Sequence, residues 1–125
     1  MNSVLISLSV TAAFFVVAIV LGFRLGRSPK PYPKLLLSAH ALMFFAIAYG
    51  IGVCLDKLSK ITTDASIAKV ALFVALGLLW ANLVSGIVMI CLKKKNHGWI
   101  LAHKLTMFAM AVSLVAAGIF MAMKR

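Results

Sequence analysis

Acidic residues are almost absent from this chain of 125 residues. It has no glutamate, and its two aspartates, Asp56 and Asp64, lie between long apolar runs rather than inside them. A carboxylate inside the membrane is the usual proton-carrying group of a coupled exporter, so its absence argues against that class. The sequence also lacks a nucleophile with an adjacent base, a glycine-rich phosphate loop and an HExxH metal motif. It therefore shows no site for hydrolysis or phosphoryl transfer.

Only two cysteines are present, and they do not form a CxxC motif. Cys54 ends the second apolar run, and Cys91 ends the third. Because consecutive membrane spans run in opposite directions, we expect the two thiols at opposite faces of the bilayer, about 30 Å apart. The sequence therefore predicts no disulfide within one chain, and the cysteines do not indicate a redox compartment.

Hydrophobic residues make up 64% of the chain and charged residues 12%, against roughly 45–50% and 25% in soluble domains. They fall into four uncharged runs, each near the roughly 20 residues that a helix needs to cross a bilayer. The sequence predicts an all-α integral membrane four-helix bundle, up-down-up-down, with both termini on the same side. Residues 1–125 form one domain in this prediction, and the spans are about 3–23, 34–54, 67–92 and 98–123.

The ends of the runs carry helix start and stop signals. Arg24 and Arg27 follow the first run as a stop-transfer flank does, and no cleavage site is present, so we interpret this run as a retained helix and not a signal peptide. Pro33 suits the first turn of the second helix. Asp64 or Thr63 is expected to cap the third helix. Asn96 is expected to cap the fourth helix.

Basic residues outnumber acidic ones by thirteen to two, which gives a net charge of +11. They lie at the ends of the runs, where lipid headgroups are the nearest partner, so we expect a lipid bilayer and no nucleic acid as partner. By the positive-inside rule, the side with more basic residues is cytoplasmic. Loops 1–2 and 3–4 are then cytoplasmic and both termini lie outside, in a bacterial inner (plasma) membrane. One side carries Arg24, Arg27, Lys30, Lys34, Lys93, Lys94, Lys95 and Lys104, and the other carries Lys57, Lys60, Lys69, Lys124 and Arg125.

Two of the three histidines, His40 and His103, fall inside predicted spans, where an ionisable side chain is costly enough to indicate a function. Each lies about two turns after the start of its helix, roughly 9–10 Å inside the same membrane face. The second and fourth helices run parallel, so the two side chains are matched in depth. Two neutral imidazoles at one depth are what six-coordinate haem iron requires. The alternative is that each histidine forms an interhelical hydrogen bond.

The helix faces around these histidines are large and apolar. Projected at i+3 and i+4, the His40 face includes Met43 and Phe44, and the His103 face includes Met107. Such side chains pack well on a porphyrin, although a methionine and aromatic stripe is more often ordinary helix packing.

The third helix reaches the same depth with small and polar residues. Asn82, Ser85 and Gly86 share one of its faces, and Gly86 gives room either for the edge of a macrocycle or for close helix packing. Lys104 points away from His103 and either reaches the headgroups or contacts a haem propionate. The excess of basic residues at this membrane face suits propionates, although the positive-inside rule alone explains it.

The sequence resembles the membrane-embedded b-type cytochromes, the four-helix kind in which histidines on the spans ligate haem. The resemblance rests on Ser38-Ala-His40-Ala-Leu-Met-Phe-Phe and on His97-Gly-Trp-Ile-Leu-Ala-His103-Lys-Leu, within a matching four-span pattern. It implies one haem b with His40 and His103 as axial ligands, and single-electron transfer with quinone or a redox partner protein. Many such proteins hold two haems, but this chain has no second histidine pair inside the membrane.

Three other interpretations remain open at this stage. The chain is alternatively a cofactor-free structural subunit of a membrane complex, a transporter or channel for a small solute or metal, or a metal site built from His40, His103 and Met43 or Met107. The expected protein partner is a redox protein or a second copy of the chain. His97 is the alternative haem ligand, at the membrane rim beside Gly98. An enzymatic role, if there is one, is that of a quinone-linked oxidoreductase component.

Overall fold

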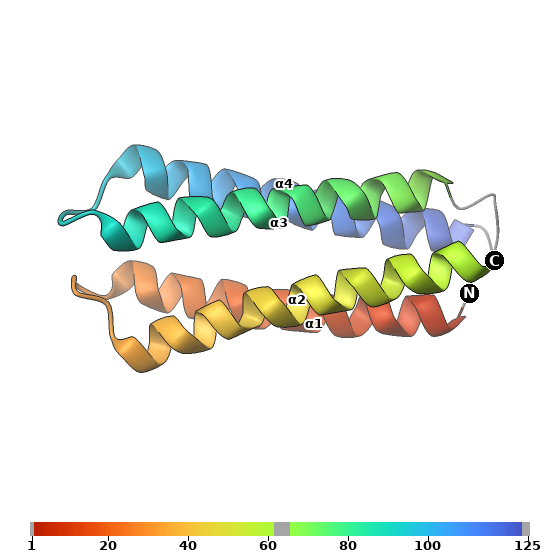
Figure 1. Cartoon of the computed structure of the whole chain (residues 1–125), viewed down its shortest axis with the longest axis horizontal. Helices are drawn as coiled ribbons and strands as arrows, with labels where there is room; N and C mark the ends of the chain where they lie inside the picture. The colour runs from red at the N-terminus through yellow and green to blue at the C-terminus, as the bar shows by residue number, and fades with distance from the viewer. Residues whose placement is uncertain (1, 62–65, 124–125) are drawn as a thin grey trace.

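The structure, a computed structural model, describes residues 2–61 and 66–123. It consists of four helices: α1 (Asn2–Arg27), α2 (Lys34–Ile61), α3 (Ser66–Cys91) and α4 (His97–Met123). They lie side by side with alternating direction, so that α1 begins and α4 ends at the same end of the molecule (Figure 1). All four are long and apolar enough to cross a membrane. The all-helical prediction is confirmed, and the arrangement is that of a four-helix bundle.

Two helices continue beyond the apolar runs that predicted them. α1 includes both Arg24 and Arg27, and α2 passes Cys54 and ends at Ile61. A charged residue ends burial in lipid, but it leaves the backbone hydrogen bonds of the helix intact. In the last turns of α2, Lys60 donates a hydrogen bond of 2.9 Å to the Asp56 carboxylate, an i, i+4 pair that supports the helix there. The helices are therefore longer than the predicted spans.

The starts of α4 and α2 agree with the predicted spans, but Pro33 precedes the first turn of α2 by one position and does not lie within it. The Asn96 side-chain oxygen accepts hydrogen bonds from the backbone N–H groups of Gly98 (2.9 Å) and Trp99 (3.3 Å), which confirms the predicted N-cap. Pro33 lies just before α2, and its carbonyl accepts the first helical hydrogen bond, from Leu37 at 2.9 Å. The predicted caps of α3, Thr63 and Asp64, lie outside the described residues.

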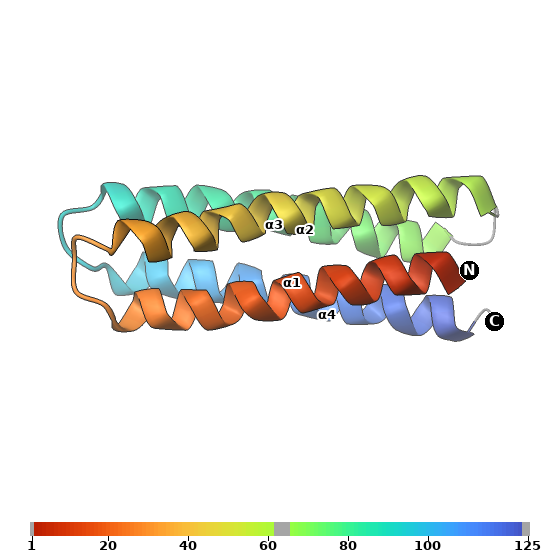
Figure 2. The same ribbon diagram turned by 90° about the horizontal axis from the view of Figure 1, so that it is seen from below.

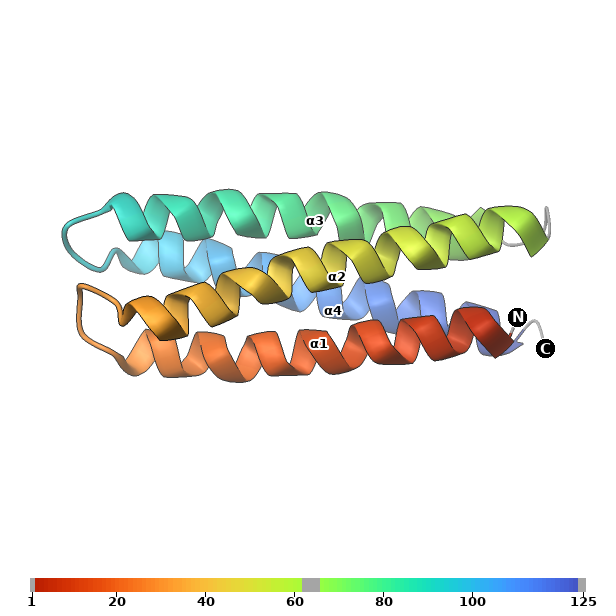
Figure 3. The ribbon, with the colours of Figure 1, turned by 60° about the horizontal axis from the view of Figure 1, so that its bottom comes forward.

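The bundle is built from two helical hairpins, α1–α2 and α3–α4, which pack more closely within themselves than against each other. Figure 1 shows the α3–α4 hairpin lying beside the α1–α2 hairpin, and Figures 2 and 3 show the same antiparallel helices from two other sides. Gly50 brings α2 close to α1, because a Cβ at this position would overlap the Thr11 hydroxyl and lie 3.0 Å from the Thr11 Cβ. Small residues allow this approach between membrane helices, where no hydrophobic effect drives association.

The interior and the outer surface are both apolar. Side chains such as Ile47, Ile51 and Met110 are fully buried along the bundle axis. Large apolar side chains also cover the outside, including Leu35 (86% exposed) and Phe108 (69% exposed). A water-soluble protein rarely exposes so continuous an apolar surface, whereas lipid solvates it well. This distribution supports the interpretation as an integral membrane protein.

Two lysines join the hairpins at the end of the bundle where the 1–2 and 3–4 loops lie. Lys30 donates hydrogen bonds to the backbone carbonyls of Met89 and Leu92 at the end of α3. Lys95 donates a hydrogen bond of 2.8 Å to the Gly26 carbonyl at the end of α1. Each hairpin thus supplies a cation to the unpaired carbonyls at the C-terminal end of a helix in the other hairpin, where the helix dipole is negative.

Candidate functional site

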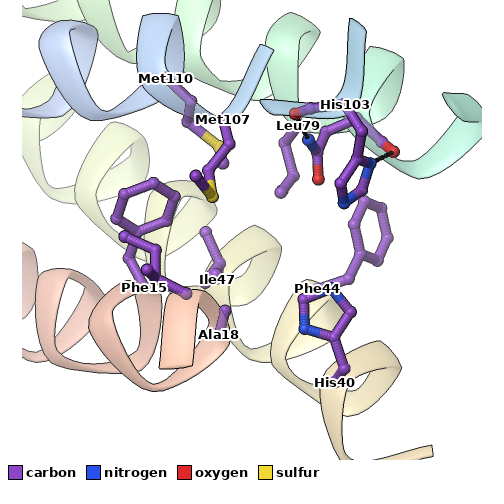
Figure 4. Close-up of a pocket in the computed structure, with 11 residues that line it drawn as sticks. Phe15, Ala18, His40, Phe44, Ile47, Leu79, His103, Met107 and Met110 are labelled. Carbon is purple, nitrogen blue, oxygen red and sulfur yellow. Dashed lines mark hydrogen bonds between the residues drawn. The ribbon is translucent and has the colours of Figure 1, made fainter. Parts of the chain in front are cut away.

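The two histidines inside the spans face each other across the boundary between the hairpins. His40 comes from α2 and His103 from α4, and their ring centres are 6.3 Å apart with planes inclined at 56° (Figure 4). The two histidines, which the sequence predicts at one depth, therefore lie directly opposite each other. The site lies nearer the loop end of the bundle that carries Lys30 and Lys95.

The separation of the rings suits coordination of a single metal atom by both histidines. A metal–imidazole bond is about 2 Å long, and ring bonds of about 1.33 Å put a nitrogen roughly 1.1 Å from the ring centre. Two imidazoles on opposite sides of one metal atom thus have centres about 6 Å apart. The observed 6.3 Å matches this value.

His103 is held in one tautomer by α3. Its Nδ1 lies 3.1 Å from the Asn82 backbone carbonyl and 3.0 Å from the Ser85 hydroxyl, and that hydroxyl itself donates to the same carbonyl at 2.8 Å. Because a carbonyl only accepts, Nδ1 carries the proton and donates it. The Nε2 atom keeps its lone pair, which is the arrangement found in metal-ligating histidines whose other nitrogen bonds to the backbone.

The backbone at His103 is fixed as well. The Asn82 side-chain amide donates hydrogen bonds of 2.8 Å to the His103 carbonyl and to the Thr106 hydroxyl. Asn82 therefore binds α4 through its side chain, and accepts from the imidazole through its own carbonyl. We refer to Asn82, Ser85, His103 and Thr106 as the α3–α4 polar clamp.

His40 has no such clamp. Its Nδ1 is buried and has no hydrogen-bond partner among the described residues. The backbone carbonyl of Ala18 in α1 faces this ring without reaching hydrogen-bond geometry. Unpaired polar atoms are uncommon in protein interiors and require an explanation, of which an absent ligand is one.

Each imidazole packs against a glycine of the preceding helix. A Cβ at Gly22 would lie 3.2 Å from the His40 Cε1, and a Cβ at Gly86 would lie 3.3 Å from the His103 Cε1. Any larger residue at these positions would press on the ring. The two glycines therefore set how deeply each ring lies against its own hairpin.

A small cavity of about 40 Å³ adjoins the histidine pair and draws on all four helices. This volume holds one or two small molecules, well below the roughly 300 Å³ or more of pockets for larger ligands. A macrocycle at this place would therefore need the side chains around the cavity to move, along the less closely packed boundary between the two hairpins. The cavity is lined by Phe15, Ala18, Ile19, His40, Phe44, Ile47, Leu79, Asn82, His103, Met107 and Met110.

The lining residues reveal an internal repeat. Residues of α1 correspond to residues of α3 at one constant offset in the sequence, and residues of α2 correspond to residues of α4 at another. The two hairpins therefore place equivalent residues around the cavity, as two copies of one structural unit would. The pairs are Phe15 and Leu79, Ala18 and Asn82, Gly22 and Gly86, His40 and His103, Phe44 and Met107, and Ile47 and Met110.

The other predicted site residues fall into two groups. Phe44 and Met107 line the cavity, while Ser85 and Gly86 contact His103 directly. Lys104 is exposed and does not line the cavity.

The remaining two candidates lie outside the cavity as well. Met43 is half-buried but is not among the lining residues, and His97 is exposed at the first position of α4.

Sequence reasoning missed Gly22 and the part that Asn82 plays. Gly22 lies near the end of the first predicted span and carries no functional signal of its own, and the sequence marks Asn82 only as a polar residue on the face of Ser85. Comparing the two halves of the chain would have aligned Gly22 with Gly86. The direct hydrogen bonds of Asn82 required the structure.

Among the residues that the structure describes, no group of three or more His, Cys, Asp or Glu side chains could hold a metal ion. The candidate site thus offers two imidazoles, those of His40 and His103. Comparisons with protein-family models, with curated proteins and with solved structures find no match to this chain.

Proposed function

We propose that this protein is a membrane-embedded b-type cytochrome that relays single electrons through one haem b held by His40 and His103. The observation that carries the proposal is the pair of facing imidazoles with ring centres 6.3 Å apart. The protonated Nδ1 of His103 supports it, because the nitrogen left free is the ligating one.

Haem suits this site better than a bare metal ion. A divalent cation held by two neutral imidazoles would keep its charge in a region without carboxylates, which is costly inside a membrane. Haem carries a dianionic macrocycle that neutralises ferrous iron, and His40 and His103 would hold it. Gly22 and Gly86 support this assignment, because they let each ring lie back against its own hairpin.

Residues around the histidines would provide the rest of the pocket. Phe44, Met107 and Leu79 would pack on the macrocycle, while basic side chains at the nearby end of the bundle would bind its propionates. The haem would supply reversible one-electron chemistry, and the chain's own residues set the polarity around it. A quinone or a redox partner protein would exchange electrons at this end, because one haem alone does not span the bilayer.

The orientation follows from the same charge distribution. The end that carries the histidine pair also carries eight of the thirteen basic residues. We place this end in the cytoplasm and both termini outside, in a bacterial inner membrane. The electron partner would then approach from the cytoplasmic side or within the cytoplasmic leaflet.

The test is the colour of the purified protein. After expression with adequate haem, the sample should show a Soret band and, on reduction, the α band of a b-type cytochrome. His40→Ala and His103→Ala should each lose most of the haem, whereas His97→Ala, at the exposed start of α4, should keep it. A colourless protein would support the cofactor-free structural subunit instead.

A further inference from the structure

Each imidazole of the pair turns one nitrogen toward its own hairpin and the other toward its partner. His103 donates from Nδ1 to the Asn82 carbonyl at 3.1 Å, and the Ala18 carbonyl, at the equivalent position of α1, faces the ring of His40. A nitrogen beside a carbonyl carries the proton, because a carbonyl only accepts, and the Nε2 atom then keeps its lone pair. In Figure 4 the Nε2 atom of each ring points toward the other histidine. Two electron-pair donors therefore face each other.

The distance between the rings suits one metal atom and is too long for a direct hydrogen bond. The ring centres are 6.3 Å apart. Nitrogens that face each other along this line would be about 4.1 Å apart, since each lies roughly 1.1 Å from its ring centre. A hydrogen bond needs about 3 Å, whereas two metal–imidazole bonds of about 2 Å each span this gap. The pair is thus spaced for a metal atom held in line by both Nε2 atoms.

The space beside the pair is large enough for a metal ion alone. The adjoining cavity of about 40 Å³ is lined by both histidines. A water-sized group needs only about 10–15 Å³ by this measure. An ion therefore fits between the rings as they stand, whereas a macrocycle needs the surrounding side chains to move. The histidine pair in the described conformation is a site for a bare ion.

Charge and donor type select the kind of ion. No carboxylate lines this cavity, so an ion with a single positive charge is less costly here than a divalent one. Met107 and Met110 line the same cavity, and Figure 4 shows both side chains directed into it. Imidazole binds copper well, and thioether is a soft donor that favours monovalent copper. Monovalent copper and silver also accept two donors in line, as the two Nε2 atoms are arranged.

We propose that the haem-free chain binds one monovalent copper ion between the Nε2 atoms of His40 and His103, with the Met107 thioether beside it. Two coordinate bonds form from the nitrogen lone pairs to the ion. No bond breaks, no electron is transferred, and each Nδ1 keeps its proton. The inference does not rest on the proposed haem, although both would use the same two nitrogens and would therefore exclude each other.

The experiment is a calorimetric titration of the full-length protein, produced without added haem and held in detergent, with Ag⁺ as the probe that is stable to oxidation. The parent for all measurements is Cys54→Ala, Cys91→Ser, because thiols bind silver themselves and Cys91 is exposed. The parent should bind one Ag⁺ per chain and should bind Zn²⁺ more weakly. X-ray absorption of the parent loaded with monovalent copper should show two nitrogen neighbours at about 2 Å.

Variants of the parent locate the ion. His40→Ala and His103→Ala should each lose the binding of Ag⁺, whereas His97→Ala, at the exposed start of α4, should keep it. Met107→Leu should lower the affinity about tenfold, the usual effect of removing a neighbour of a bound metal. Met43→Leu is its matched control, because Met43 lies outside the cavity lining. It should leave the affinity unchanged.

The inference would be overturned by a parent that binds no Ag⁺, by binding that both histidine variants keep, or by tighter binding of Zn²⁺ than of Ag⁺. Copper with sulfur neighbours alone would also overturn it, and this measurement does not depend on the folding of any histidine variant. None of these results would affect a protein that turns red with haem. A chain that stays colourless with haem would contradict the proposed function and leave this inference intact.

Discussion

Gly22 and Gly86 occupy equivalent positions in the two hairpins, and each lies directly against the imidazole of the helix that follows. The added Cβ would be 3.2 Å from His40 Cε1 in one case and 3.3 Å from His103 Cε1 in the other. These contacts are tight enough that each ring would shift by a few tenths of an ångström. The geometry of the histidine pair therefore depends on two residues without side chains.

The first prediction concerns these glycines. Gly22→Ala and Gly86→Ala should each change the inclination of one ring and lower the content of the proposed haem, which the Soret absorbance per protein and the electron paramagnetic resonance spectrum measure. Gly77→Ala is the control, because a Cβ at Gly77 meets nothing within 4 Å. Equal haem content and identical spectra in all three variants would contradict the role of the glycines.

The second prediction concerns the polar clamp. Asn82→Ala removes two hydrogen bonds between α3 and α4, to the His103 carbonyl and to Thr106. Interhelical hydrogen bonds in membranes contribute about 0.6 kcal/mol on average and up to about 1.7 kcal/mol. We expect a loss of about 1–2 kcal/mol in the free energy of unfolding, measured by titration with a denaturing detergent.

The control for Asn82 is Ser113→Ala. The Ser113 hydroxyl donates within α4, to the Ala109 carbonyl at 3.0 Å, so no contact between helices is lost. If this variant lost as much stability as Asn82→Ala, the loss would not come from the hydrogen bonds between α3 and α4, and the prediction for the polar clamp would be wrong.

The third prediction concerns the closest approach of α1 and α2. Gly50→Ala should destabilise the protein by about 1–3 kcal/mol, because overpacking forces neighbouring atoms to move. The new Cβ would overlap the Thr11 hydroxyl and crowd its methyl carbon at 3.1 Å. Thermal denaturation in detergent measures the change. The double variant Gly50→Ala, Thr11→Ala should recover part of the lost stability. Gly52→Ala should be neutral, because a Cβ at Gly52 meets nothing within 4 Å.

The fourth prediction concerns the lysines that join the hairpins. Lys30→Met and Lys95→Met should each cost about 0.3–1 kcal/mol, the usual contribution of a cation at a helix C-terminus. Hydrogen exchange should increase in the last turn of α3 for the first variant and in the last turn of α1 for the second. Lys94→Met, at an exposed loop position, should change neither helix end.

The fifth prediction concerns orientation. Cys91 is exposed at the end of α3, near the basic loops, and Cys54 is buried. A membrane-impermeant maleimide should therefore label the chain in inside-out vesicles and leave it unlabelled in intact cells. Cys91→Ser should abolish the labelling. Labelling of the wild-type protein in intact cells would reverse the proposed orientation.

The sequence by itself determined the four helices, their antiparallel order and the depth of the two histidines. Long uncharged runs can satisfy their backbone in lipid only as helices, and a rise of about 1.5 Å per residue then fixes how far each side chain lies from the membrane face. His40 and His103 were identified as a pair on these grounds alone.

Only the tertiary structure decided what surrounds that pair. The sequence does not say how a helix is rotated about its axis, and this rotation sets whether Asn82 reaches the His103 carbonyl and whether Gly22 lies against His40. It also decides that the Ser85 hydroxyl lies 3.0 Å from the Nδ1 atom of His103. The surroundings of the two histidines depend on contacts between helices, which local sequence patterns do not encode.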